Sequence, residues 1–214
     1  MEMQIEIRAL KACALSAGKK DVRYYLNGVL IEPRANDALC VGTDGHRMTV
    51  ARSEADGFNG SGFELIVPID RVNLALKAAA KNQETLLLEN DGSGYRLGGI
   101  PFIAMDGKFP AWRHTVPTIE LVEGQEKAAT FNPAYLVDAA KSIAAYEGRP
   151  ASKAVLGGFR LFQNGNSGAI MRGIDPGCFV IIMPVRRDSA LEGLSMNADR
   201  EWIGTPVSEL KFVG

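Results

Sequence analysis

The sequence predicts an α+β protein built from a repeated unit of one strand, one helix and several further strands. Short segments in which apolar and polar residues alternate indicate half-buried strands. Three longer segments rich in alanine and leucine have the apolar spacing that is typical of helices. Because these segments follow one another in the same order three times, internal repetition is the main organising feature of the chain.

The first block starts with an alternating segment at residues 3–8, which we predict to be a strand, and a helix is expected at residues 9–17. In the turn sequence TDGH, Gly45 would supply backbone freedom and Asp44 would form local hydrogen bonds. The turn-forming stretches PRAND and TDGH separate three further strands. These strands are expected at residues 23–31, 38–43 and 47–52.

The second block opens with a predicted strand at residues 63–67. Pro68 suits the first turn of a helix, and this helix is expected to end near Lys81. Glycine-rich turns then separate the remaining strands of the block. They are expected at residues 85–89, 95–97 and 100–105.

The third block is predicted to open with a strand at residues 128–131. Asn132 is a plausible N-cap and Pro133 a plausible first residue for a helix at residues 134–145. Short apolar segments after the helix predict the strands of this block. They are expected at residues 154–156, 159–163, 169–172 and 179–185.

The repeats divide the chain into parts of unequal completeness. Residues 106–125 are rich in proline, glycine and charge, which is typical of a linker. We therefore predict a complete two-block domain at residues 1–118 and a half-domain with the third block at residues 119–187. Residues 188–214 repeat nothing earlier and are expected to form a tail without an assigned role.

Composition narrows the classes of function. The chain has 24 basic and 25 acidic residues, a formal charge of -1, which excludes a protein that binds nucleic acid over its whole surface. Any DNA contact would need a segregated basic stripe. Cys13, Cys40 and Cys178 form no CxxC pair, so neither a disulfide framework nor a zinc site is predicted. No leader or membrane-spanning segment is recognisable, and we expect a soluble, cytoplasmic protein with no membrane partner.

Lysines recur on the predicted helices. In the second helix, Lys77 and Lys81 share one face with Asp70 and Asn73, opposite the apolar residues. Such a face is compatible with a helix side that is simply exposed to solvent. It is also compatible with a DNA-binding role, in which the helices present lysines to the phosphate backbone independently of base sequence. The comparable lysines of the first and third blocks are Lys11, Lys19 and Lys141.

Two motifs make the sequence recognisable: DVRYYLNG at residues 21–28 and TDGHRM at residues 43–48. Together they resemble the middle domain of the bacterial DNA polymerase III beta subunit, the sliding clamp. Further segments resemble the same family in collinear order over residues 1–187. They are IVP at 66–68, DGKFPAWRHTVP at 106–117, FNPAYLVD at 131–138 and VIIMPVRR at 180–187.

The resemblance implies the DNA-clamp fold, with antiparallel sheets outside and the helices on one face. It also implies a protein without enzymatic activity, which holds replication or repair proteins near double-stranded DNA. Members of the family carry three whole domains per chain, whereas this sequence matches one domain and the second half of the next. A ring would therefore need several chains, so we expect a homo-oligomer, with the half-domain completed by a neighbour or by the tail.

In the family, short apolar peptides of polymerases and of the clamp loader bind in a groove between the middle and last domains. The motifs that line this groove remain in the sequence, although Leu26, Ile182 and Met183 could equally be core residues of apolar segments. His114 and Thr115 stand where the family has a basic and an aliphatic residue. The groove that the resemblance implies is lined by Leu26, Thr43, Gly45, His46, Arg47, Met48, Pro110, His114, Asn132, Tyr135, Ile182, Met183, Pro184, Val185 and Arg186.

No catalytic, metal or cofactor site is predicted. The chain has two histidines, His46 and His114, and lacks the GxSxG, HExxH and P-loop motifs. Its histidines and cysteines also lack the spacing of metal ligands. Two hypotheses remain: a clamp-like processivity factor, or a non-encircling adaptor or decoy that binds clamp-interacting proteins. They differ in assembly and in DNA binding, since only the first requires a stable oligomer on DNA.

Overall fold

The computed structural model describes residues 2–54, 63–90, 92, 94–117, 129–149, 158–163 and 167–185. The chain divides into two compact units, residues 1–184 and residues 185–214. Only Val185 of the second unit is described. The predicted tail at residues 188–214, the predicted strand at residues 154–156 and Arg186 of the predicted groove all lie outside the described residues.

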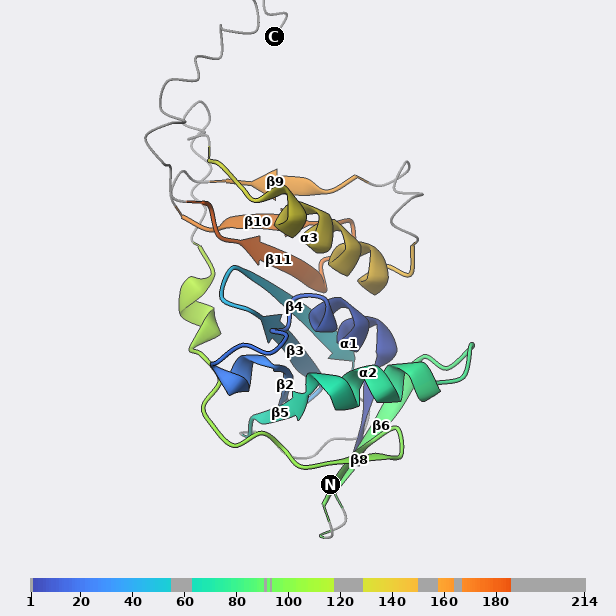
Figure 1. Ribbon diagram of the computed structural model, residues 1–214. Helices are drawn as coiled ribbons and strands as arrows, with labels where there is room; N and C mark the ends of the chain where they lie inside the picture. Colours follow the sequence, from blue (N-terminus) through green and yellow to red (C-terminus); the bar gives the residue numbers. More distant parts are fainter. Residues whose placement is uncertain are drawn as a thin grey trace, which may run out of the picture. The chain divides into compact units, whose positions relative to one another are not determined.

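The first two repeats form one structure, which we call the closed domain (residues 2–117; Figure 1). Each repeat has a strand, a helix and a meander of three strands. The first contains β1 (Glu2–Glu6), α1 (Ile7–Ala14), β2 (Gly28–Pro33), β3 (Asp37–Thr43) and β4 (Arg47–Glu54). The second contains β5 (Leu65–Pro68), α2 (Ile69–Ala78), β6 (Thr85–Asn90), β7 (Tyr95–Leu97) and β8 (Ile100–Phe102). Two 3-10 helices complete it, at Tyr24–Leu26 and Trp112–Thr115.

The two repeats exchange their first strands. Strand β1 of the first repeat pairs antiparallel with β6 of the second, so that Ile5 lies opposite Leu86. Reciprocally, β5 of the second repeat pairs with β2 of the first, so that Val67 lies opposite Val29. Each sheet of the closed domain therefore contains strands of both repeats, and neither repeat can form its sheet alone.

The third repeat, which we call the third unit (residues 129–184), joins the closed domain edge to edge. It contains α3 (Pro133–Tyr146), β9 (Arg160–Phe162), β10 (Ala169–Arg172) and β11 (Cys178–Ile182). Strand β11 pairs antiparallel with β4, with Cys178 opposite Ala51 and Ile182 opposite Arg47. The result is one sheet of seven strands in the order β5-β2-β3-β4-β11-β10-β9 that runs through both parts (Figure 1).

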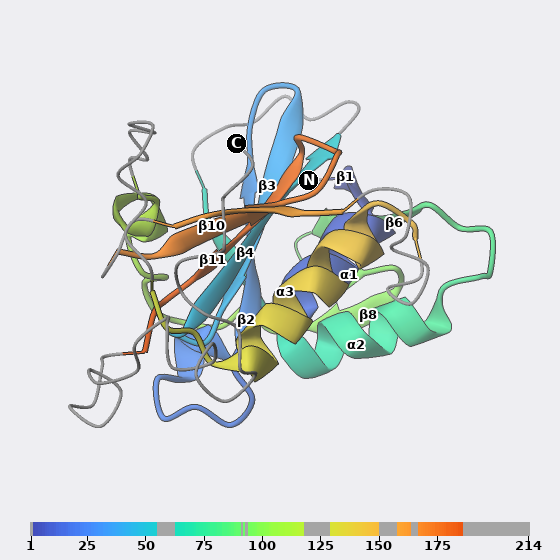
Figure 2. The same cartoon turned by 90° about the horizontal axis from the view of Figure 1, so that it is seen from above.

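The three helices form one layer beside the sheets (Figure 2). Helix α1 packs against both α2 and α3, and α3 also covers β11 and β4. The largest apolar core lies under α1 and α2, and a smaller one lies under α3. A further core, which contains Phe109 and Trp112, lies between the sheet and the segment that follows β8. These arrangements confirm the α+β fold with helices on one face.

Local chemistry explains where α3 begins. The side-chain Oδ1 of Asn132 accepts a hydrogen bond from the backbone N–H of Ala134 at 2.9 Å, and Pro133 is the first helical residue. Both residues have the predicted roles, because an N-cap oxygen satisfies an otherwise unpaired N–H and proline lacks that N–H.

Three predicted elements were wrong. The strand expected at residues 23–31 is a 3-10 helix at Tyr24–Leu26 followed by β2. Helix α2 ends at Ala78, not near Lys81, because Ala79 is already extended and the chain turns back toward β6. Ala129, Thr130 and Phe131 are not in a strand. An opening strand needs the meander of another repeat as its partner, and the described part of the chain contains no fourth repeat.

Candidate functional site

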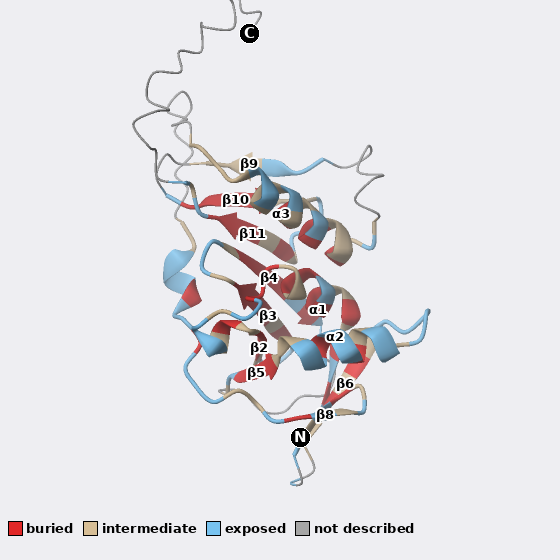
Figure 3. Cartoon of the chain, viewed as in Figure 1, coloured by how far each residue is buried: buried red, intermediate tan, exposed pale blue. Residues whose placement is uncertain are grey.

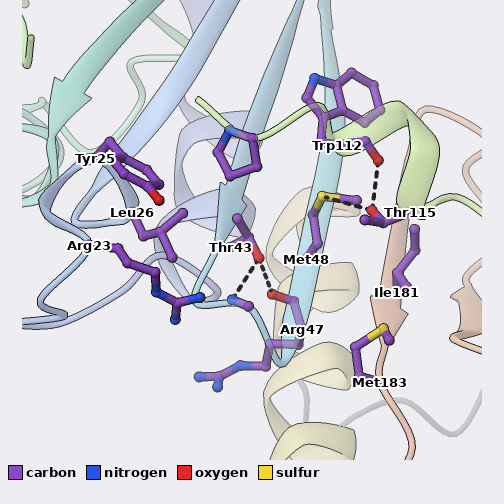
Figure 4. A pocket seen from close by; sticks show the side chains of 12 residues that line it. Arg23, Tyr25, Leu26, Thr43, Arg47, Met48, Trp112, Thr115, Ile181 and Met183 are labelled. Atoms are coloured by element: carbon purple, nitrogen blue, oxygen red, sulfur yellow. Dashed lines mark hydrogen bonds between the residues drawn. The ribbon is translucent and has the colours of Figure 1, made fainter. Parts of the chain in front are cut away.

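A cavity of about 180 Å³ lies at the seam where β4 meets β11 (Figure 4). The closed domain supplies most of its wall, from the Tyr24–Leu26 helix, the β3–β4 turn and the segment around Trp112. The third unit supplies the rest, from Ile181 in β11 and Met183 just after it. The lining residues are Arg23, Tyr25, Leu26, Thr43, Gly45, Arg47, Met48, Pro110, Trp112, Thr115, Ile181 and Met183.

The β3–β4 turn forms one rim of the cavity. Asp44 Oδ1 accepts hydrogen bonds from the backbone N–H groups of His46 at 2.9 Å and of Arg47 at 3.1 Å. Gly45 has a φ of 87°, in the left-handed region that disfavours other residues. Thr43 Oγ1 accepts from the Gly45 N–H at 3.0 Å and donates to the Arg47 carbonyl at 2.8 Å. These bonds confirm the tight turn predicted for TDGH.

Arg47 connects this rim to the third unit through ion pairs. Its guanidinium lies 2.6 Å from the Asp44 carboxylate and 2.8 Å from that of Asp138 on α3. It also lies 5.0 Å from the ring centroid of Tyr135, which stacks on His46 at 5.5 Å. Since Arg47 touches groups from both parts while only 12% of its side chain is exposed, it helps to fix the position of α3 at the cavity.

The interior of the cavity is apolar. Leu26, Met48 and Ile181 are buried. Met183, by contrast, is 40% exposed and stands at the opening, where its backbone N–H donates to the carbonyl of His46 at 2.9 Å. A flexible methionine at a rim can adapt to side chains of different shape. The cavity therefore suits an apolar group that enters past Met183.

Trp112 lines the cavity and carries a buried hydrogen-bond donor. It is only 6% exposed, and within the described residues its Nε1 donor has no hydrogen-bond partner. Thr115 Oγ1 donates to the Trp112 carbonyl at 2.7 Å, and the Arg113 guanidinium covers the indole at 4.3 Å. The short helix is thus held in place. A buried indole N–H usually has an acceptor, so this donor could serve a bound group.

Arg23 forms an ion pair with Asp21 at the rim of the cavity. Its side chain donates to the Asp21 carboxylate at 2.8 Å and to the carbonyl of Asp44 at 3.0 Å. The hydrogen bond from Arg23 lowers the pKa of the Asp21 carboxyl to about 2. Asp21 is therefore ionised throughout the neutral range and holds Arg23 beside the cavity.

The predicted groove residues fall into two groups. Those that line the cavity are Leu26, Thr43, Gly45, Arg47, Met48, Pro110 and Met183. The others are not lining residues: His46 and Tyr135 stack on each other, and Asn132 caps α3. His114 is exposed on the second 3-10 helix, Pro184 is half-buried beyond β11, and Val185 is exposed.

Strand geometry explains why Ile181 lines the cavity and the predicted Ile182 does not. Successive side chains of a strand point to opposite faces. Ile182 is fully buried in the core under α3, whereas Ile181 faces the cavity side with Met183. The alternation starting from Met183 could have identified Ile181 from the sequence. The other lining residues that the prediction missed are Arg23, Tyr25, Trp112 and Thr115, and all of them lie inside the recognised motifs.

The predicted lysines lie on the helix layer and around it. Lys11, Lys77 and Lys141 belong to α1, α2 and α3 respectively, and all three are exposed. Lys19 and Lys81 are exposed too, but both lie outside the helices. Because the three helices pack in one layer (Figure 2), the helical lysines are presented from neighbouring elements.

The described part of the chain gives little support for a metal site, a reactive thiol or a membrane-spanning helix. No cluster of histidine, cysteine, aspartate and glutamate there could hold a metal ion. Burial raises the pKa of Cys40 and of Cys178 to about 12, so these thiols are poor nucleophiles at neutral pH. None of the described helices has the length and apolar character needed to span a membrane.

Comparison with known proteins identifies the relatives of this arrangement. Residues 2–111 match the family described as DNA polymerase III beta subunit, central domain. The beta sliding clamp of Vibrio cholerae is 34% identical over 119 residues, which cover 53% of this chain and 32% of that protein. That of Escherichia coli K12 is 32% identical over 114 residues, which cover 51% and 31%. The chain thus spans about a third of the length of the curated relatives it matches.

Solved structures extend the likeness to the third unit. The DNA polymerase III subunit beta of Pseudomonas aeruginosa aligns with a TM-score of 0.69 and 18% identity, over 87% of this chain and 66% of that one. The sliding clamp of Bacillus subtilis aligns with a TM-score of 0.62 and 16% identity, over 88% and 65%. At these identities the likeness concerns the fold, and it confirms the predicted DNA-clamp fold.

Proposed function

The chain belongs to the DNA polymerase III beta subunit family, and on this premise we propose that it is a sliding-clamp-like processivity factor. In this role it binds short peptides of polymerases or clamp loaders and tethers these proteins to double-stranded DNA in the cytoplasm. The relatives named above are beta sliding clamps, and the family is one of non-enzymatic proteins. The proposed activity accordingly requires no catalytic group.

The cavity at the β4–β11 seam is the observation that carries the proposal. Its volume of about 180 Å³ exceeds the roughly 150 Å³ of an engineered cavity that holds benzene. It lies below the roughly 300–1,000 Å³ of pockets for drug-sized ligands. The space therefore suits one large apolar side chain, such as leucine or phenylalanine, better than a complete small molecule.

Polar groups at the cavity could recognise the peptide around such an anchor. The unpartnered Nε1 of Trp112 can donate a hydrogen bond to a carbonyl oxygen. Arg23 is held at the rim by Asp21 and by the carbonyl of Asp44, where its guanidinium can donate a further hydrogen bond to the peptide. A peptide bound there would be anchored by apolar burial and oriented by hydrogen bonds, which is how small apolar sites obtain specificity.

DNA tethering would use the helix layer. Lys11, Lys77 and Lys141 stand exposed on three packed helices, and lysines can attract phosphates without reading base sequence. The formal charge of -1 makes a localised basic face necessary for this. The proposed clamp is a homo-oligomer that surrounds DNA, as membership of the sliding-clamp family implies.

An adaptor or decoy is the second candidate. The cavity is formed within one chain, so both candidates would bind peptides there. An adaptor would keep peptide affinity but show no retention on DNA, whereas a clamp would show both.

The Met183→Ala variant tests the peptide site. Met183 is 40% exposed at the cavity opening, so its loss should leave folding intact. We expect a short synthetic peptide with leucine and phenylalanine side chains to bind about 5-fold to 10-fold more weakly, as for an interface residue whose truncation costs about 1 kcal/mol or slightly more. Isothermal titration calorimetry measures the affinity of variant and wild type.

The Ile174→Ala variant is the matched control, because Ile174 is 69% exposed in the same unit and does not line the cavity. It should bind the peptide like the wild type. Equal affinities for all three proteins, with unchanged circular dichroism, would disprove peptide binding in this cavity.

A further inference from the structure

Within the described residues, the third unit has no equivalent of the partner that completes each repeat of the closed domain. In the closed domain, β2 is flanked by β3 and β5 and is also contacted by α2. Strand β9 holds the equivalent place in the third unit, as the outermost strand of its meander. Among the described residues, β9 pairs with β10 only and ends the sheet.

Burial shows the consequence of this missing partner (Figure 3). Five of the six residues of β2 are buried. In β9, by contrast, Arg160 is exposed and Leu161 and Phe162 are only half-buried. Phe159, which precedes the strand, is 50% exposed. Apolar side chains are therefore incompletely covered at the place where the closed domain has a second repeat.

Helix α3 also has an incompletely covered side, where Leu136 packs at the edge of the core under the helix. Asp138 reaches Arg47 of the closed domain. Residues two positions away on a helix lie on nearly the opposite side, since each residue turns by about 100°. Leu136 and Ala140 therefore face away from the closed domain, and both are half-buried. Apart from Asp138 and Lys141, α3 contains no charged residue.

We propose that a second copy of this chain completes the third unit, with the two third units related by a twofold axis. Each copy would then place α3 beside the partner's α3, as α1 lies beside α2. The residues before α3, Ala129–Phe131, would form the missing strand on the partner's β9. The seven-stranded sheet of each copy would thereby continue beyond β9.

The closed domain is the reason to choose a second copy as the occupant. There, β1 pairs with β6 and β5 pairs with β2 in a reciprocal exchange between two repeats of the same plan. Reciprocity of this kind is what a twofold axis produces between identical chains. Twofold pairing also places like residues near one another, which the uncharged row of Leu136 and Ala140 tolerates. A short peptide could supply the strand but not a second helix, whereas a second copy supplies both.

The proposal refines the homo-oligomer that the proposed function requires, and it rests on that function. Its test measures mass and amide exchange, so it can fail while peptide binding at the cavity persists, and the reverse is also true.

The double variant Ala140→Glu/Phe159→Glu of the full-length chain tests the interface. It places negative charge on both uncovered elements, so like charges would oppose each other across the axis. Light scattering coupled to size-exclusion chromatography should give this variant half the mass of the wild type. The Ile103→Glu variant is the control, because Ile103 is 89% exposed beside β8 at the end of the other sheet. This variant should keep the wild-type mass, because it leaves the pairing of the two third units unchanged.

Hydrogen exchange of the wild type provides a readout that does not depend on mass. The amides of Ala129–Phe131 should exchange at least about tenfold more slowly in the wild type than in the double variant, because pairing protects them. A monomeric wild type would overturn the proposal and indicate that the chain's own tail or another protein covers this side. So would a double variant that keeps the wild-type mass and the wild-type exchange.

Discussion

The closed domain and the third unit follow the same plan, but they differ in how far their strands are covered. Strand β2 is almost entirely buried, because a neighbour lies on each side of it and α2 contacts it. Among the described residues, strand β9 has one neighbour, and it stays partly exposed. The comparison teaches that one repeat of this fold is not self-sufficient. It contributes a first strand to another repeat and needs one in return.

The cavity depends on both regions. The closed domain provides the turn around Gly45 and the wall around Trp112, while the third unit provides Ile181 and Met183. Pairing of β4 with β11 sets the register between them, and Arg47 adds an ionic contact to α3. The part of the structure with the weaker cover thus supplies one wall of the proposed peptide site.

Core substitutions should show the largest difference between the two regions. Leu30 of β2 is fully buried, so Leu30→Ala should lower the free energy of unfolding by about 2–5 kcal/mol. Leu161 of β9 is half-buried. Leu161→Ala should cost less than about 1.5 kcal/mol, because less apolar surface returns to water. Urea denaturation of dilute protein, followed by circular dichroism, measures both losses. Equal losses would show that β9 is covered as completely as β2.

Thiol labelling should reveal a second difference between the two regions, because the labelling rates of their cysteines should differ about tenfold. Cys178 lies in β11 of the third unit, whereas Cys13 and Cys40 lie in the closed domain, and all three are buried. If the third unit opens more readily, Cys178 should react at least about tenfold faster than the other two, since exchange follows local opening. Mass spectrometry of labelled peptides identifies which thiol has reacted.

The pH dependence of this labelling distinguishes opening from direct attack. Burial raises the pKa of Cys178 to about 12, whereas an exposed thiol has a pKa near 8.5. Reaction through an opened state should accelerate about tenfold per pH unit below that value and then level off. A rate that keeps rising toward pH 12 would mean that the folded thiol reacts directly.

Lysine substitutions should have the smallest effects. If α3 belongs to the same DNA-facing layer as α2, Lys141→Glu and Lys77→Glu should each weaken DNA binding by a similar factor. Loss of one phosphate contact reduces the slope of log affinity against log salt by about 1. Fluorescence anisotropy with a DNA duplex over a range of salt concentrations measures this slope. An effect of Lys77→Glu alone would exclude the third unit from the DNA-facing layer.

Local chemistry made several features predictable from the sequence. The TDGH turn needs a left-handed glycine and an aspartate that bonds to nearby N–H groups, and both residues do so in the structure. Asn132 and Pro133 marked the start of α3 for similar reasons. The three repeats and the family were recognisable too, because apolar spacing and collinear motifs are properties of the sequence itself.

Only the tertiary structure decided which strands form and which faces meet. Residues 128–131 have the sequence of an opening strand, but such a strand forms by pairing with another repeat, and local preference does not supply that partner. Ile181 and Ile182 are identical in type, and the pairing of β11 with β4 settles which of them faces the cavity. A sequence by itself determines turns, caps and periodicity because these depend on neighbours along the chain. Strand exchange and the seam cavity depend on contacts between distant segments.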